Sequence, residues 1–169
     1  MNKPFKRVGF LGVVVIGMSL FLGTVFPDKA PWMMDGFSTP ILAFEFVQSK
    51  DEVIRLFGLS NSESQPSGAQ SNRSSMILAM DSGNGLDYIY MVLYASFLFF
   101  FSLVCRKITG QALYYAASLM AVVILFADAF ENIQLLSITS KMSRLDFAKE
   151  LTFLHWFTWI KWGGISLVF

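Results

Sequence analysis

The chain has 169 residues, which is the size of one domain, and 54% of them are hydrophobic while only 15% are charged. These proportions are unusual for a soluble globular protein and are typical of a membrane protein. A net charge of +1 offers no basic face to a nucleic acid, and the single cysteine, Cys105, excludes an internal disulfide.

Four stretches of the chain are long and apolar enough to cross a bilayer. A spanning helix needs about 20 residues, because the hydrocarbon layer is about 30 Å thick and each residue rises about 1.5 Å. No stretch alternates polar and apolar residues, so we expect helices rather than barrel strands. The predicted fold class is an all-α integral membrane protein, a four-transmembrane-helix bundle in a single domain over residues 1–169. The predicted spans are residues 8–26, 86–104, 112–136 and 151–169.

The first span follows three basic residues, Lys3, Lys6 and Arg7, as the apolar part of a signal peptide would. Its apolar stretch is long for a signal peptide, and the nearest small residue, Ala30, precedes a proline, which is a poor cleavage context. We therefore interpret the span as a retained anchor, with a cleaved signal peptide as the alternative.

Basic residues near the spans predict the orientation of the bundle. Five of them flank the side of the N-terminus and three flank the short loop on the other side. We therefore expect both termini in the cytoplasm and the long loop, residues 27–85, outside.

The first half of this outer loop is predicted to be folded. Thr39 is typical of a helix N-cap, and Pro40 is typical of the first helical position. Ser49 and Glu52 have the spacing of a capping box. We predict short amphipathic helices within residues 40–57, lying on the outer membrane face or capping the bundle.

The second half of the loop has a different composition. Residues 60–75 are rich in Ser, Asn, Gln and Gly, which predicts a flexible linker. Residues 76–80 form a short apolar run that we expect to return to the membrane, and residues 81–85 are typical of a turn leading into the second span.

Polar side chains gather inside the third and fourth spans. Such side chains are costly at bilayer depth, so they tend to face the bundle interior and to pair. Asp128, Glu131 and Asn132 share one helical face because they are three and four residues apart. In the fourth span, His155 lies about as deep as Glu131, and Lys161 about as deep as Asp128, at about 1.5 Å per residue. We predict an outward-opening polar pocket formed by these five residues.

Three further residues complete the candidate pocket, with Asp87 and Tyr94 in the second span and Glu45 above them in the outer loop. Two carboxylates that lie close together in a medium of low dielectric do not both ionise readily, so a proton held there could be shared, shuttled or donated. The alternative is structural, because polar contacts between membrane helices contribute roughly 0.6 to 2 kcal/mol each. An Asp128–Lys161 pair would then only fix the register of the two helices.

The sequence carries no motif for a metal or a cofactor, and we expect neither. One histidine cannot form a multi-histidine metal site, and Cys105 and His155 are far apart in the sequence, so they give no signal of a catalytic dyad.

Five short segments occur in a fixed order along the chain: Ile41–Phe46, Asp51–Val53, Leu86–Tyr94, Asp128–Asn132 and Ile160–Trp162. In this order they resemble a group of uncharacterised bacterial four-helix inner-membrane proteins. The resemblance implies a bacterial inner (plasma) membrane location and no particular activity. It also implies that the polar residues of these segments form one constellation: Glu45, Asp87, Tyr94, Asp128, Glu131, Asn132 and Lys161.

Three classes of function remain open from the sequence. The first is a binding or accessory protein whose pocket holds a lipid head group or a partner helix. The second is a membrane-embedded enzyme that uses Glu131 or Asp128 as an acid or base on a lipid or isoprenoid substrate. The third is a small proton- or ion-coupled carrier that works as an oligomer. Membrane lipid is the expected partner, with a second membrane protein or a second copy of the chain as further candidates.

Overall fold

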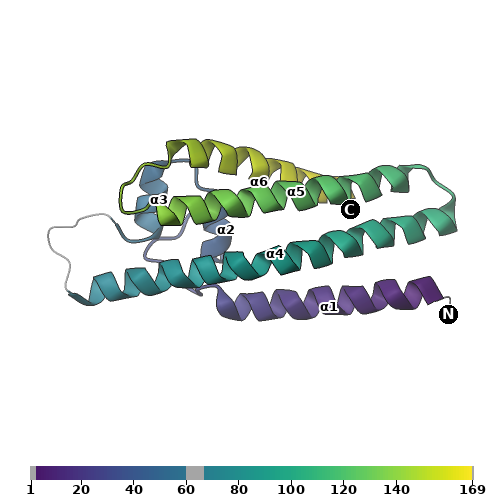
Figure 1. The fold of residues 1–169 in the computed structure, drawn as a ribbon, viewed down its shortest axis with the longest axis horizontal. Coiled ribbons are helices and arrows are strands. Elements are labelled where there is room, and N and C mark those ends of the chain that lie inside the picture. The colour runs from purple at the N-terminus through teal and green to yellow at the C-terminus, as the bar shows by residue number, and fades with distance from the viewer. Residues whose placement is uncertain (1–2, 60–66, 169) are drawn as a thin grey trace.

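The computed structural model describes residues 3–59 and 67–168, and each regular element in these two ranges is an α-helix. Four long helices lie side by side and run alternately in opposite directions (Figure 1). They are α1 (Lys3–Val25), α4 (Ser67–Thr109), α5 (Leu113–Ser140) and α6 (Ala148–Val168). Two short helices, α2 (Pro40–Glu45) and α3 (Lys50–Leu56), lie near the end of the bundle where α4 begins (Figure 1). The predicted all-α fold is confirmed.

The long helices pack in the order α1, α4, α5, α6. Extensive contacts join α1 to α4, α4 to α5 and α5 to α6. Among the described residues, α1 and α6 share no packing of comparable extent. Helices α1 and α6 are therefore the two outermost helices of this series.

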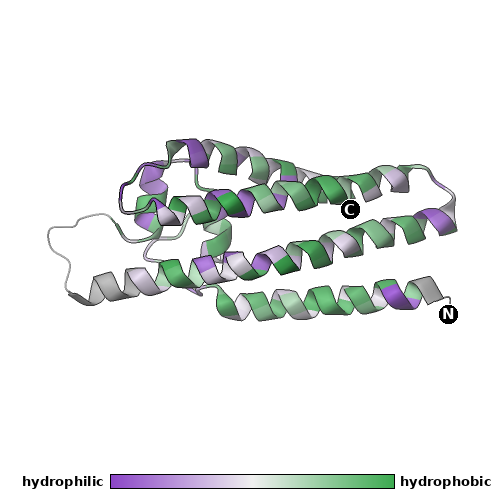
Figure 2. Cartoon of the chain, in the orientation of Figure 1, coloured by the Kyte–Doolittle hydropathy of each residue, from purple (hydrophilic) through white to green (hydrophobic). Residues whose placement is uncertain are grey.

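Three of the long helices are long and apolar enough to cross a membrane. They comprise Phe5–Val25 in α1, Ser74–Thr109 in α4, and the whole of α5. Large apolar side chains such as Phe10 and Leu119 are exposed on them. Hydrophobic residues predominate along these helices (Figure 2). The span predicted at 86–104 falls within α4, and those predicted at 8–26 and 112–136 each extend one residue beyond α1 and α5. The fourth helix, α6, has 21 residues, but polar residues in it lower its mean hydropathy and it does not belong to this set.

Helices α2 and α3 begin where the sequence predicts. Thr39 occupies the N-cap of α2 with extended backbone and Pro40 is the first helical residue, although the Thr39 side chain makes no capping hydrogen bond. The capping box of α3 is confirmed, because Ser49 Oγ accepts from the Glu52 backbone N–H and Glu52 Oε2 accepts from the Ser49 N–H, each at 3.3 Å. Gly58 ends the segment with a φ of +66°.

An apolar core fixes α2 and α3 to the bundle. Phe44 and Phe57 are buried side by side with their ring centroids 5.0 Å apart. Met80 of α4, Leu135 of α5 and Leu154 of α6 belong to the same core and are completely buried. Burial of this apolar surface holds the short helices against three of the long ones.

The prediction of a flexible linker over 60–75 is wrong for its second part. Helix α4 begins at Ser67 and includes residues 67–75, whereas residues 60–66 lie outside the described part of the chain. Polar composition alone does not exclude a helix when the residues that follow it are held in helical form by packing.

The predicted turn at 81–85 is also wrong, because α4 continues through it. The apolar run at 76–80 lies in the same helix, within the part of α4 that is apolar enough to cross a membrane. Met80 anchors this part of the helix in the apolar core. Gly83 lies under the ring of Phe26, where a Cβ atom would come within 2.3 Å of the ring. The glycine therefore permits close approach of two chain segments, a role that outweighs its helix-propensity cost of about 1 kcal/mol.

Candidate functional site

Lys161 of α6 stands among three carboxylates contributed by α2 and α5. Its Nζ atom lies 2.6 Å from Glu131 Oε2, 3.1 Å from Glu45 Oε2 and 3.3 Å from Asp128 Oδ1. The Lys161 side chain is 8% exposed and that of Glu131 is completely buried. We name Lys161, Glu45, Asp128 and Glu131 the Lys161 cluster.

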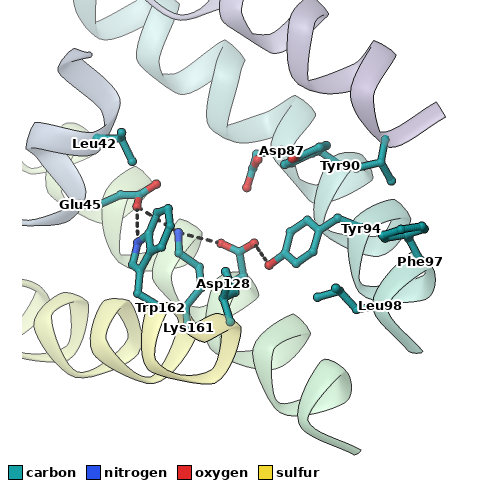
Figure 3. Close-up of a pocket in the computed structure, with 12 residues that line it drawn as sticks. Leu42, Glu45, Asp87, Tyr90, Tyr94, Phe97, Leu98, Asp128, Lys161 and Trp162 are labelled. Atoms are coloured by element: carbon teal, nitrogen blue, oxygen red, sulfur yellow. Dashed lines mark hydrogen bonds and ion pairs between the residues drawn. The ribbon is translucent and has the colours of Figure 1, made fainter. Parts of the chain in front are cut away.

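Two hydrogen bonds join α4 to α5 here, one of them to Asp128 of the cluster. The hydroxyl of Tyr94 donates to Asp128 Oδ2 at 2.6 Å (Figure 3), and Nδ2 of Asn132 donates to Asp87 Oδ2 at 2.7 Å. Asp87 and Tyr94 share one face of α4 because they are seven residues, or two turns, apart. The structure thus brings together seven of the eight predicted pocket residues.

Two residues of α6 that were not part of the predicted pocket hold Glu45 in place. Thr158 Oγ1 lies 3.1 Å from both the Glu45 carbonyl oxygen and Glu131 Oε1, so the hydroxyl can donate to either. The indole N–H of Trp162 donates to Glu45 Oε2 at 3.1 Å (Figure 3). Thr158 lies three residues before Lys161, and this spacing is the sequence signal that identifies it as a neighbour.

The prediction that His155 belongs to the pocket is wrong. His155 is exposed, and its ring packs edge-on against Trp159 with centroids 6.1 Å apart. Six residues separate it from Lys161, which places the two side chains about 120° apart around the helix. Although His155 and Glu131 were predicted to lie at equal depth in the bilayer, His155 therefore does not point toward the pocket.

The site holds more acidic than basic groups. Four carboxylates gather there, from Glu45, Asp87, Asp128 and Glu131, and in the described part of the chain Lys161 is the one basic group that pairs with any of them. Buried charge without a partner is strongly unfavourable, so the excess has to be balanced by protons or by hydrogen-bond donors. Within the same ranges, no set of three or more His, Cys, Asp or Glu residues could hold a metal ion.

A cavity of about 420 Å³ adjoins the Lys161 cluster (Figure 3). One side of it is polar and includes the side chains of Glu45, Asp87, Asp128 and Lys161. The remainder is mostly apolar, and all four long helices together with α2 contribute to it. We name it the amphipathic cavity, lined by Val15, Leu42, Glu45, Asp87, Tyr90, Tyr94, Phe97, Leu98, Asp128, Lys161, Trp162 and Ile165.

Comparison of the chain with models of known protein families, with curated proteins and with solved structures finds no match.

Proposed function

We propose that the chain is an integral membrane binding protein whose amphipathic cavity holds one lipid-like molecule. The polar part of that molecule would lie against the Lys161 cluster, and its apolar part would lie against Phe97, Leu98 and Ile165. The observation that carries the proposal is that Lys161, Glu45 and Asp128 line a cavity instead of being enclosed on all sides by protein.

The shape and chemistry of the cavity support a ligand of this class. Its volume of about 420 Å³ falls within the range of small-molecule sites, roughly 300 to 1,000 Å³. A ligand with a hydrocarbon chain gains about 0.8 kcal/mol for each CH₂ group that it buries. A few fixed polar groups at one end would orient it, as is common in such sites.

The arrangement of the helices supports entry from the bilayer. Val15 of α1 and Ile165 of α6 both line the cavity, yet these two helices share no extensive packing in the described part of the chain. A lipid moving sideways between α1 and α6 would separate few protein contacts.

The proposal includes the placement of the chain in the membrane. We take α6 as a fourth spanning helix, because it packs along α5 in the opposite direction and turns Lys161 and Thr158 inward. Helices α2 and α3 would then lie on the outer side, both termini would be cytoplasmic, and the membrane would be a bacterial inner membrane.

The structure lends less support to the enzyme and the carrier. Glu131, the carboxylate at the centre of the cluster, is completely buried and does not line the amphipathic cavity, so a bound substrate would not reach it. Asp128 does line the cavity, but Tyr94 occupies its Oδ2 and Lys161 its Oδ1. A carrier would need a polar path to the other end of the bundle. That half instead contains an apolar cluster built on Leu98, Ala121 and Ile124.

The test is to identify what copurifies with the full chain in a mild detergent, by mass spectrometry of extracted lipids. One amphiphile should be enriched over bulk membrane lipid, and Val15→Phe should remove it by filling the apolar side of the cavity. Val13→Phe is the matched control, since Val13 lies on the same helix and is 67% exposed. Equal lipid content in both variants, or no enriched species in the parent protein, would contradict the proposal.

A further inference from the structure

A second cavity, of about 490 Å³, lies beside the first, toward the end of the bundle that carries α2 and α3. It is bordered by the end of α1, the segment that follows it, α2 and α4. Leu42, Glu45, Asp87 and Tyr90 line both cavities, so the two adjoin each other along these side chains. We name the second cavity the polar chamber.

Asn84 of α4 lines the polar chamber, and the amide nitrogen of its buried side chain lacks a hydrogen-bond partner in the described part of the chain. The residue is 1% exposed, and its Nδ2 atom has no partner among the described residues. A buried N–H group left without an acceptor costs about 1 to 3 kcal/mol. An acceptor that bound the Asn84 N–H group would remove this cost, and the described part of the chain does not supply one.

The other polar groups of the chamber call for donors. Asp28, Glu45 and Asp87 contribute carboxyl groups. An ionised carboxylate can accept hydrogen bonds but cannot donate them. Asp87 has Oδ2 occupied by Asn132, and no side-chain hydrogen bond to its Oδ1 is found in the described ranges. A suitable occupant would therefore accept a hydrogen bond from Asn84. It would also donate one to a carboxylate, from a group close to the one that accepts.

The N–H group of Asn84 and the carboxylates of the chamber together favour some chemical groups over others as the occupant. None of the described residues that line the chamber is Lys, Arg or His, so a phosphate or carboxylate would meet only negative charge. A quaternary or primary ammonium would suit the carboxylates but would leave the Asn84 amide without an acceptor. A hydroxyl group both accepts and donates, and it satisfies both kinds of partner.

We infer that the polar chamber binds an uncharged, hydroxyl-rich group, a polyol or a sugar, through Asn84 and Asp87. This inference rests on the proposed function, because we take the group to be the head of the amphiphile whose apolar part occupies the amphipathic cavity. The same chemistry could come from a free sugar, and the experiment below separates the two sources.

The experiment uses three probes with the same ten-carbon chain: decyl glucoside, decyl phosphate and decyltrimethylammonium. Binding to the full chain in phosphatidylcholine nanodiscs is measured by calorimetry and corrected for partitioning into empty nanodiscs. Decyl glucoside should bind at least about tenfold more tightly than either charged probe. Asn84→Leu should weaken decyl glucoside about tenfold, the size expected for one buried hydrogen bond, and should leave the charged probes unchanged.

The ligand-free protein gives a second readout that separates binding from folding. Asn84→Leu should not lower the melting temperature without ligand, because it removes a buried N–H group for which the described residues supply no acceptor and keeps a similar volume. Gln48→Leu is the matched control, since it removes an exposed amide near α3 and should change neither affinity nor stability. A large loss of ligand-free stability in Asn84→Leu would mean that the amide has a structural partner, and it would overturn the inference.

The remaining outcomes are also decisive. Equal affinity for all three probes, or decyl glucoside binding that Asn84→Leu does not weaken, would show that the chamber holds only water. Free glucose that binds as tightly as decyl glucoside would support the hydroxyl chemistry and identify a soluble ligand as its source. Val15→Phe should abolish binding of all three decyl probes. If it abolishes none of them, the proposed function fails, independently of the result for Asn84.

Discussion

The ammonium group of Lys161 lies closer to Glu131 than to Asp128, at 2.6 Å against 3.3 Å. Glu131 is also the most deeply buried carboxylate of the cluster. The carboxylate nearest to Lys161 is therefore Glu131, whereas the sequence had suggested Asp128 from equal depth in the bilayer.

Replacing Lys161 with Met should lower the free energy of unfolding by about 3 to 5 kcal/mol, since it leaves buried carboxylates without a cation. Adding Glu131→Gln to Lys161→Met should recover part of this loss, and adding Asp128→Asn should recover less. Unfolding in detergent, followed by circular dichroism, gives the two coupling energies. Additive losses in both double variants would contradict the ion pairing. Lys141→Met breaks the partly exposed pair with Glu150 and serves as a control that should change stability by about 1 kcal/mol at most.

Tyr94→Phe should destabilise the protein by about 1 to 3 kcal/mol, because it leaves Oδ2 of the buried Asp128 without the hydroxyl that donates to it at 2.6 Å. Tyr115→Phe is the matched control. Its ring lies under Arg106, at 3.6 Å from the guanidinium carbon to the ring centroid, and the phenylalanine ring preserves that contact. Thermal unfolding of both variants in the same detergent checks the difference. A Tyr94→Phe protein as stable as the Tyr115→Phe protein would show that the hydrogen bond adds nothing.

Gly164→Ala should cost about 1 to 3 kcal/mol, because the new Cβ atom would lie 2.7 Å from Ile124 Cγ1 and would push α6 away from α5. Gly163→Ala has open space around it and should be neutral or stabilising by about 0.5 to 1 kcal/mol, as expected for a glycine inside a helix. In the Gly164→Ala background, Ile124→Ala should cost less than it does alone. Equal stabilities of the Gly163 and Gly164 variants would mean that the two helices are not in close contact there.

Glu150, which lies outside the predicted spans, gives a prediction for the pH dependence of thermal stability. Its hydrogen bond and ion pair with Lys141 hold its pKa below the ordinary value of 4.5. A carboxyl group with a lowered pKa stabilises the fold above its unfolded pKa, and this stability is lost as the pH falls through its folded pKa. Glu150→Gln should therefore lower the melting temperature slightly at pH 7. Below the folded pKa of Glu150 the parent and the variant should melt alike, and a difference that persists there would exclude the pair as its cause.

Much of the fold follows from local sequence patterns. The three most apolar helices are predictable because hydrocarbon thickness fixes the length of a spanning segment. The start of α3 is predictable because the Ser49–Glu52 capping box satisfies backbone N–H groups within a single turn. The beginning of α4 is not predictable in this way, since its helical form depends on Met80 and Gly83, which contact residues distant in the sequence.

The site shows the same division between local and distant information. Asp128, Glu131 and Asn132 could be assigned to one face because all three lie on one helix. Lys161 could be paired with them by depth, but depth says nothing of rotation about the helix axis, which is why His155 was assigned wrongly. The sequence could not show that the amide nitrogen of Asn84 lacks a hydrogen-bond partner, because this is visible only when the positions of its neighbours are known.

Helix α4 contains 43 residues and therefore extends about 65 Å, roughly twice the thickness of the hydrocarbon layer. One uninterrupted rod connects the apolar core around α2 and α3 with Asn84, Asp87 and Tyr94. Because the helix is continuous, a tilt of its outer turns would also displace these three side chains. A spectroscopic label at the exposed Ser82 would thus report on the geometry of the binding site from a position outside it.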